Sequence, residues 1–504
     1  MKRLYSSASA RLLITIVFFL PLKEADCSLR QLKMYEFQEK IQEKTIFSSI
    51  AATPAPSPAH SIDPKKSDGR VFYPIGYGAD PSGVADSSDA ILEAIGYAFG
   101  IQNKGFQLLP GIKDLGGVVI DLQGGNYLIS RPLRFPSGFG NILVQGGTLR
   151  ASNTFPGHRH LIELWSPNSR KLEKESTTIH HLHGLSDRED QNSGIYYEDV
   201  TFRDILFDSS YQGGGLFVID AARIRINNCY FIHFTTQGVL VERGHETFIS
   251  GCFLGQHETV GGDSGERGFS GTAIELSSTD NAVTDVVIFS AAVGITVSGQ
   301  ANIIIGVHCY NKATYFGGIG ILVRAAQTRV ESCYLDYNSI VIQDPALVQV
   351  SNGYFIGDGN IVLKSINGKA SGLNIINNIF AGDPRNMVPI VKLDGEFTDI
   401  AQVVIENNIV TGMTLKSTVG KLTVAGNGTQ WIADFSSVLV FPNKINHVQY
   451  SIYTEGVVAG FPAHKMTNVS NNLVVIESEK AFSGVISVIV DQYNMDGERN
   501  LCNT

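Results

Sequence analysis

A short phrase of apolar runs separated by Asn, Gly or Ser recurs about every two dozen residues, and this repeat limits the fold more than any other feature. Its clearest copies are RINNCYFIHF (225–234), FISGCFLGQ (248–256), RVESCYLDYN (329–338), VSNGYFIGDGN (350–360), IINNIFAGD (375–383) and IENNIVTGM (405–413). A second short apolar run follows such copies, as in GVLVE (238–242), GIGILV (318–323) and NIVLK (360–364). Runs that are short, rich in β-branched residues and bounded by turn residues are typical of strands.

A unit of two or three short strands, with roughly 20–26 residues per repeat and no room for a helix, predicts a solenoid of stacked coils. A β-propeller needs roughly 40–50 residues per repeat, and the fixed Leu and Asn positions of leucine-rich repeats are not found. We therefore expect an all-β fold, a right-handed parallel β-helix. Its corners should contain the Asn pairs of the repeat, because Asn tolerates a left-handed backbone and its amide can bond the next coil. These pairs are Asn227–Asn228, Asn377–Asn378 and Asn407–Asn408. Turn residues of a β-sandwich are the alternative.

Four cysteines are spaced by about one coil. Cys252 follows Cys229, and Cys333 follows Cys309, each after close to one repeat of the sequence. Stacked coils lie about 4.8 Å apart, within the Cα separation that a disulfide spans. We therefore predict the bridges Cys229–Cys252 and Cys309–Cys333, with buried free thiols as the alternative. Cys502 is left over, and its partner would be Cys27 or none.

The N-terminus has the pattern of a secretory signal peptide. Three basic residues precede a short apolar core, Leu12–Leu20, and small residues follow it. A membrane anchor is the alternative, but this run is about half of the ~20 residues that a membrane span needs. We expect a signal peptide at 1–27 and a secreted, extracellular protein, with no membrane association after cleavage. Glycosylation sequons at Asn427 and Asn468 agree with that route.

Beyond the signal peptide, three further parts are expected. Residues 28–69 form a charged leader with a Pro-rich linker. The repeats place the parallel β-helix at 70–430, and short alternating runs predict a β-rich C-terminal cap at 431–504. Within the β-helix region, the polar stretch 165–193 is expected to be an inserted surface loop. The formal net charge of −9 argues against a nucleic-acid partner, whose binding surface should be basic.

Residues 75–99, IGYGADPSGVADSSDAILEAIGYAF, place a Gly-rich acidic loop before an Ala- and Ile-rich helix. This segment resembles the N-terminal block of the pectate-lyase-like superfamily, and GGVVIDLQGGNYLIS (116–130) and GTLRAS (147–152) resemble the next two blocks. The resemblance implies a β-helix whose open end is covered by an N-terminal capping helix. Residues of this block that can cap the helix or its loop are expected to be structural: Asp80, Asp86, Ser87 and Asp89.

Within the superfamily, the chain looks most like the divergent, Quartet-type polygalacturonases of plants. That resemblance implies hydrolysis of α-1,4-galacturonan, with polygalacturonate or pectin as the partner, in walls such as those of pollen mother cells. The usual polygalacturonase motifs, Asn-Thr-Asp, Asp-Asp, Gly-His-Gly and Arg-Ile-Lys, are not found. Gln237, in Thr-Thr-Gln, stands where one such Asp is expected, and a glutamine cannot act as acid or base.

Glycoside hydrolysis by the usual route needs two carboxyl groups. On a β-helix they should precede strands at equivalent points of neighbouring coils. Asp336 and Asp358, separated by close to one repeat, have this placement, and Asp383 follows on the next coil. Adjacent coils give ~5 Å and alternate coils ~10 Å, so the inverting range of about 6.5–9.5 Å can be reached. Turn residues are the alternative for all three. A second acidic group lies in the Gly-rich loop 257–271.

The carboxylates of a polyuronate need cations, and Arg suits bidentate binding. The basic residues close to the chosen strands are Lys312, Arg324, Lys364 and Arg385, and Tyr337 could stack on a sugar ring. We expect a monomeric hydrolase with no metal and no cofactor. Two rival functions are left open: a Ca²⁺-dependent pectate lyase on the same fold, and a non-catalytic protein that binds wall polysaccharide.

Overall fold

The computed structural model of the chain describes residues 65–101, 106–169, 194–256, 270–310, 318–454, 460 and 462–495. The expected signal peptide, nearly all of the leader, and most of the loop 165–193 lie outside these residues, as do Cys27 and Cys502. In the part of the chain that is described, no helix has the length and apolar character needed to cross a membrane.

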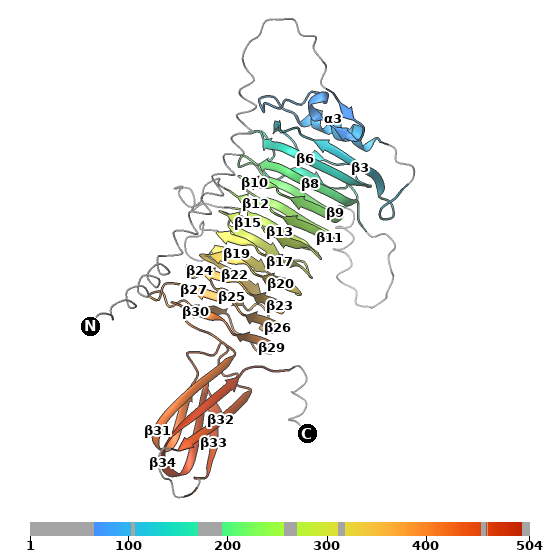
Figure 1. Ribbon diagram of the computed structural model, residues 1–504. Coiled ribbons are helices and arrows are strands. Elements are labelled where there is room, and N and C mark those ends of the chain that lie inside the picture. The colour runs from blue at the N-terminus through green and yellow to red at the C-terminus, as the bar shows by residue number, and fades with distance from the viewer. Residues whose placement is uncertain are drawn as a thin grey trace, which may run out of the picture. The chain divides into compact units, whose positions relative to one another are not determined.

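The described chain begins with a small cap. A short antiparallel pair, β1 (Ser67–Asp68) and β2 (Val71–Phe72), leads into a 3-10 turn, Pro74–Tyr77, and then α3 (Ser88–Phe99). One face of α3 is buried against the first coil, and the Phe99 ring lies 5.2 Å from that of Phe139. The expected capping helix is therefore confirmed, and it covers the apolar end of the core (Figure 1).

The acidic residues of this block have structural partners. Asp80 accepts the backbone N–H groups of Ser82, Val84 and Ala85 at 2.7–3.0 Å. Asp86 accepts the N–H of Ser88 at 3.1 Å, at the first turn of α3. Both carboxylates therefore order the loop and the start of the helix, as the sequence predicted.

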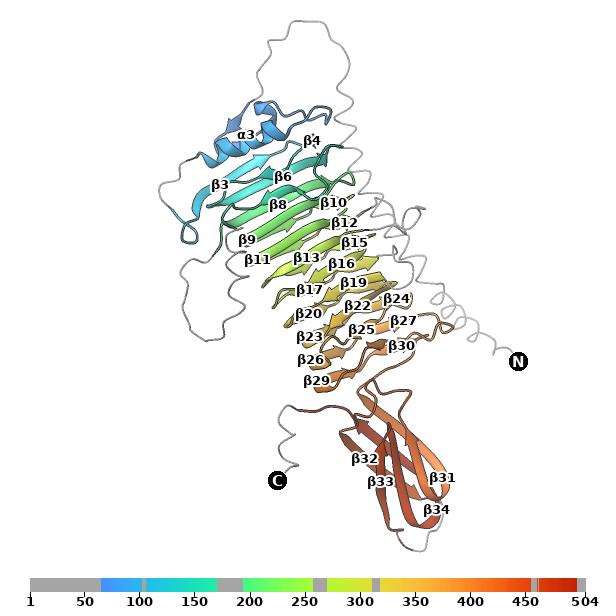
Figure 2. The ribbon, with the colours of Figure 1, turned by 180° about the vertical axis from the view of Figure 1, so that it is seen from behind.

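Together with β1 and β2 of the cap, the strands up to β30 form one continuous thirty-stranded sheet of the described chain, which winds into a parallel β-helix (Figures 1 and 2). Each coil contributes strands to three columns, and the strands within a column are parallel. Four strands are long enough to bend through a corner and belong to two columns: β6 (Phe139–Ala151), β8 (Tyr197–Asp208), β9 (Gly214–Asn227) and β11 (Gln237–Ser250).

Column one contains the starts of β9 and β11 together with β5 (Leu133–Arg134), β7 (His160–Leu164), β13 (Thr272–Thr279), β16 (Val293–Val297), β19 (Gly318–Val323), β22 (Asn338–Gln343), β25 (Ile361–Lys364) and β28 (Val391–Asp394). Column two contains β2, the starts of β6 and β8, the ends of β9 and β11, and β3 (Lys113–Asp121), β14 (Ala282–Thr284), β17 (Ile303–Ile305), β20 (Thr328–Glu331), β23 (Ala346–Ser351), β26 (Lys369–Ile376) and β29 (Asp399–Glu406). Column three contains the ends of β6 and β8 and then β4 (Asn126–Ile129), β10 (Tyr230–Ile232), β12 (Phe253–Gly255), β15 (Val287–Phe289), β18 (His308–Tyr310), β21 (Tyr334–Asp336), β24 (Tyr354–Ile356), β27 (Ile379–Ala381) and β30 (Ile409–Thr411).

The corner between columns two and three explains the repeated Asn, Gly and Ser. From β9 onward, one residue of each coil has a left-handed backbone there, with φ between 50° and 63°: Asn228, Gly251, Asp285, Gly306, Ser332, Asn352, Asn377 and Asn407. Asn, Asp and Gly adopt this conformation most easily, which is why the repeat keeps returning to them. The amide of Asn378, one residue later, bonds Asn408 of the next coil at 3.1 Å. The predicted corner role of the Asn pairs is confirmed.

The core is a set of ladders in which like residues stack on like. In column three, the rings of Phe207 and Phe231 stack at 4.6 Å, and those of Phe355 and Phe380 at 4.4 Å. All four side chains are fully buried. A single coil could not bury such residues, so each coil depends on its neighbours for stability.

The predicted disulfides are not present, and the four described cysteines are buried free thiols. Because His308 pairs with Tyr334, Cys309 stacks on Leu335 and is out of register with Cys333. The spacing of Cys309 and Cys333 is therefore shorter than one coil, and the prediction of the Cys309–Cys333 bridge was wrong. Cys229 and Cys252 do stand in register, but the Cys252 sulfur accepts the backbone N–H of Cys229 at 3.4 Å.

The last described part is an antiparallel sheet of four strands: β31 (Val419–Asp434), β32 (His447–Thr454), β33 (His464–Ser470) and β34 (Leu473–Asp491). The long strand β34 pairs with the other three. The sheet has its own core around Trp431 and Phe435. The expected β-rich C-terminal cap therefore begins at Val419, earlier than the expected boundary at 431. Both sequon residues, Asn427 and Asn468, are exposed on it.

Candidate active site

The three predicted carboxylates lie at one corner of the β-helix, where the chain passes from column three to column one. Asp336 ends β21, Asp358 follows β24, and Asp383 follows β27. Because Asp336 pairs with Ile356 and Ile356 with Ala381, Asp358 and Asp383 are equivalent residues of neighbouring coils. Asp336 stands two residues earlier in the repeat. From the spacing of strands and residues, its Cα is roughly 8 Å from that of Asp358.

Asp336 and Asp358 have different surroundings. Asp336 is only 9% exposed, and its Oδ2 lies 3.3 Å from Nε2 of His308 on the preceding coil. Asp358 is half-buried, and its Oδ1 accepts the N–H of Asp383 at 2.8 Å. The other oxygen of Asp358 accepts Nδ2 of Asn386 at 2.6 Å. These two donors fix the orientation of the Asp358 carboxylate.

Asp383 is committed to a salt bridge. Its carboxylate accepts Nε of Arg385 at 2.9 Å, and hydrogen bonds from Arg385 lower the pKa of Asp383 to about 2. A carboxyl group with so low a pKa does not hold a proton near neutral pH and cannot serve as a general acid there. The same salt bridge occupies Arg385, a predicted substrate-binding residue.

The structure divides the other predicted substrate-binding residues between two corners. Tyr337 directly follows Asp336, so it lies at the corner of the carboxylates, where it is exposed. Arg324 and Lys364 lie at the opposite ends of column-one strands. Lys364 is six residues from Asp358, which corresponds to roughly 20 Å of extended chain. Lys312 lies outside the described residues, as do residues 257–269 of the second acidic group.

A polar cluster that we did not predict lies near the start of column one. Glu163 of β7 is 1% exposed and forms salt bridges with Arg134 and Arg159. Burial alone would raise the pKa of Glu163, but hydrogen bonds and charge from the two arginines outweigh it and hold the pKa below its ordinary range. His160, on the same strand, is also buried, and burial lowers its pKa to about 4. The signal in the sequence was HRHLIEL (158–164), in which His, Arg and Glu interrupt an apolar strand.

A second unpredicted cluster lies at the same type of corner as Asp336, on earlier coils. Nδ1 of His233 lies 2.7 Å from Oδ1 of Asp208, and the Tyr211 ring lies 4.7 Å from that of His233. Burial would raise the pKa of Asp208, but the hydrogen bond and charge of His233 lower it below its usual value. This Asp–His pair could relay a proton at the corner.

Gln237, which replaces an expected Asp, starts β11 in column one. Its Nε2 donates to Oε2 of Glu275 on the neighbouring strand β13 at 3.0 Å. The amide therefore orients a carboxylate instead of acting as one. No group of three or more His, Cys, Asp or Glu arranged to hold a metal ion occurs among the residues whose placement is described.

Comparison with known proteins gives one extensive similarity in sequence. The chain is 50% identical over 448 residues, 87% of each chain, to "Polygalacturonase QRT3" of Arabidopsis thaliana. No known family profile matches it. Among solved structures, endo-xylogalacturonan hydrolase from Aspergillus tubingensis covers 68% of this chain and 92% of its own, with 12% identity and a TM-score of 0.48. The tailspike protein of E. coli bacteriophage HK620, in complex with a pentasaccharide, covers 84% and 94%, with 11% identity and a TM-score of 0.38. Similarities this distant carry no argument.

Proposed function

The chain belongs to the same family as Polygalacturonase QRT3 of Arabidopsis thaliana, and from this membership we propose that it hydrolyses α-1,4-galacturonan in the pectin of the plant cell wall. The substrate would be polygalacturonate, with the pollen-mother-cell wall as the expected site of action. The protein would be secreted as a monomer and need no cofactor. Exposure of Asn427 and Asn468 supports glycosylation of the secreted chain.

The observation that carries the mechanism is the pair Asp336 and Asp358, two carboxyl groups in different surroundings at one corner. A Cα separation of roughly 8 Å is compatible with the range of about 6.5–9.5 Å between the carboxyl groups of inverting glycosidases. Asp358 is the more exposed of the two, so it would take the proton of the attacking water. Asp336 is nearly buried and would give its proton to the leaving glycosidic oxygen. His308 would hold Asp336 in position.

The two carboxyl groups are tested by replacing each with its amide. We expect Asp336→Asn and Asp358→Asn each to lower kcat on polygalacturonate by at least ~10²-fold, the scale for loss of a general acid or base. Asp383→Asn should have a smaller effect, because its salt bridge with Arg385 already excludes it as an acid. The matched control is Asp86→Asn. The carboxylate of Asp86 accepts a hydrogen bond at the start of α3, far from Asp336 and Asp358 in the sequence. Near-full activity of both main variants, with unchanged melting temperatures, would show that the site lies elsewhere.

The reaction type is tested by mass spectrometry of the products. Hydrolysis gives saturated oligomers, whereas a lyase gives products lighter by one water at the new end. Loss of activity with a chelator would favour the Ca²⁺-dependent lyase. An intact polymer that stays bound to the protein would favour the non-catalytic alternative.

A further inference from the structure

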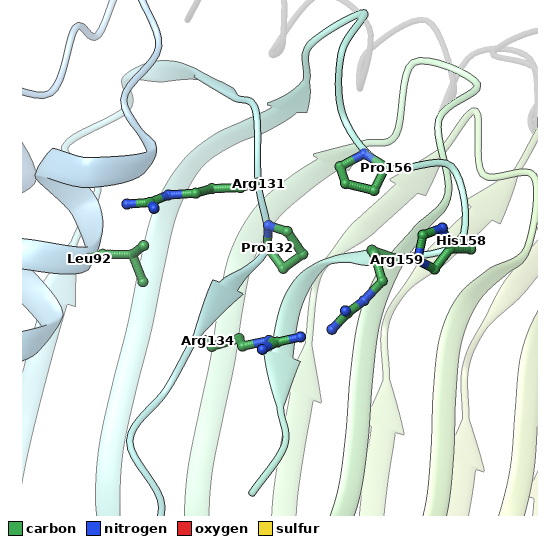
Figure 3. A pocket seen from close by; sticks show the side chains of 7 residues that line it. All are labelled: Leu92, Arg131, Pro132, Arg134, Pro156, His158 and Arg159. Carbon is green, nitrogen blue, oxygen red and sulfur yellow. The ribbon is translucent and has the colours of Figure 1, made fainter. Parts of the chain in front are cut away.

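A basic pocket lies beside α3, where the first coils pass from column three to column one. Its volume is about 420 Å³. Its lining residues are Leu92, Arg131, Pro132, Arg134, Pro156, His158 and Arg159 (Figure 3). The ionisable groups of this lining are three guanidinium groups and one imidazole, so the pocket suits an anion.

The arginines exceed the carboxylates that neutralise them. Arg134 and Arg159 share the single carboxylate of Glu163, which is buried behind them. Nε of Arg134 donates to Oε2 of Glu163 at 2.9 Å, so the two Nη groups of Arg134 are not needed for this salt bridge. Arg131 pairs with Asp89, whose side chain is 85% exposed and leaves that pair open to solvent. The pocket therefore has net positive charge and donors that can face a ligand.

The pocket also has the surfaces that a sugar ring needs. The guanidinium carbon of Arg134 lies 4.7 Å over the ring of Trp165, a contact that holds the guanidinium plane in one orientation. Leu92, Pro132 and Pro156 supply apolar walls. Figure 3 shows that Arg134, at the end of β5, and Arg159, just before β7, extend toward each other, which brings two guanidinium groups of the lining close together.

From these contacts we infer that the pocket binds a uronate residue of the polymer, with the sugar carboxylate held by Arg134 and Arg159. This inference rests on the proposed function, because it takes galacturonan as the ligand. Six strand steps in column one separate β7 from β22, which corresponds to about 29 Å along the coil axis. The pocket is therefore a subsite remote from Asp336, and it would anchor a long polymer without touching the bond that is cleaved.

Binding is tested without catalysis, using digalacturonate and its neutral methyl ester as probes. Because the chain contains 2 Trp, the fluorescence of Trp165 can report binding, with Trp165→Phe to identify its signal. We expect Arg134→Gln to weaken digalacturonate binding at least tenfold and to leave the weak binding of the ester unchanged. On polygalacturonate, the same variant should raise KM with little change in kcat. Arg203→Gln, an arginine of column two outside the pocket, is the matched control.

Two further measurements keep the result decisive. If Arg134→Gln fails to fold, Arg134→Lys retains the charge and removes the planar fork, and it should bind digalacturonate with intermediate affinity. Wild-type affinity of folded pocket variants for digalacturonate would overturn the subsite, whatever the result for Asp336 and Asp358. Loss of binding in these variants, together with no cleavage of polygalacturonate by the wild type, would support the subsite and reject the proposed hydrolysis.

Discussion

Burial acts in opposite directions on two ionisable residues of β7. It raises the pKa of Glu163, where salt bridges with Arg134 and Arg159 prevail and leave the group charged. It lowers the pKa of His160 to about 4, so the imidazole is neutral at the mildly acidic to neutral pH of most assays. One strand therefore contains a buried charge that is paired and a buried base that is kept neutral, which is how proteins usually tolerate such groups.

His160 should make stability depend on pH. Its folded-state pKa of about 4 is below the unfolded value of about 6.5, so between these values the unfolded chain binds more protons. The contribution of neutral His160 to the free energy of unfolding is therefore fully present above about pH 6.5. As the pH falls from there to about 4, this contribution decreases by about 3 kcal/mol in total. Hydrogen bonds and charge from Arg159 and Arg134 lower the pKa of Glu163, so its carboxylate also contributes stability that is lost as the pH falls. The measurement is the free energy of unfolding from denaturant curves between pH 4 and 7.

The variant that tests this prediction is His160→Gln. Its free energy of unfolding should change much less with pH between pH 4 and 6.5 than that of the wild type. His245→Gln removes a partly exposed imidazole from column two and should keep the wild-type slope. Equal slopes in His160→Gln and the wild type would mean that the pKa of His160 is the same in the folded and the unfolded chain.

Residue identity alone was a partial guide to the candidate site. The corner position of Asp336 and Asp358 could be predicted, because carboxylates before an apolar strand must lie at a turn. The offset of two residues between Asp336 and Asp358 could not be predicted, because it depends on coils of unequal length. Lys364 was chosen for its closeness in sequence to a strand, but it lies at the far end of that strand. Glu163 and His160 were missed because nothing in a single strand shows which basic residues will pack beside it.

At the scale of elements, each coil is closed by the corner between columns two and three. The left-handed residue turns the chain, and in two coils the residue after it, Asn378 or Asn408, bonds the preceding coil through its amide. Asn378 bonds the preceding coil through both ends of its amide, since its Oδ1 accepts the N–H of Gly353 at 2.9 Å and its Nδ2 donates to the carbonyl of Val350 at 3.1 Å. The Asn pairs were predictable because this corner repeatedly needs a residue that accepts a left-handed backbone. The cysteine spacing misled because insertions at the other corners change the coil length.

Asn378→Ala should therefore destabilise the protein strongly. The change leaves the buried N–H of Gly353 and the carbonyl of Val350 without their side-chain partner, at about 1–3 kcal/mol each. We expect a loss of about 3–5 kcal/mol in the free energy of unfolding, measured by denaturant titration. The matched control is Asn377→Ala one residue earlier, an exposed residue with φ 58°.

Asn377→Ala should cost about 1–2 kcal/mol for the left-handed backbone alone, and Asn377→Gly should cost little because glycine adopts that conformation freely. If the alanine variants at 377 and 378 were equally destabilised, the side-chain bonds of Asn378 would contribute nothing beyond the turn itself.

At the scale of the whole molecule, the described chain has two large hydrophobic cores. One extends through the stacked coils of the β-helix and includes Val440 and Phe441, whose ring lies 6.1 Å from that of Phe397. The other is confined to the antiparallel sheet. The β-helix as a class could be predicted from the repeat, because only stacking buries one side of every coil. The start of the antiparallel sheet could not be predicted, because buried and exposed residues alternate in β31 in the same way as in the strands before it.

These two cores predict unfolding in two steps. The core of the antiparallel sheet is far smaller than that of the β-helix, so the sheet should unfold at a lower denaturant concentration. The 2 Trp residues of the chain can separate the steps, since Trp431 lies in the sheet core and Trp165 beside the first coils. In Trp165→Phe the fluorescence reports the sheet, and in Trp431→Phe it reports the β-helix. We expect the fluorescence of Trp165→Phe to show the lower denaturant midpoint. Circular dichroism of either variant should show both unfolding steps. Coincident midpoints by both probes would instead mean that the two cores unfold as one cooperative unit.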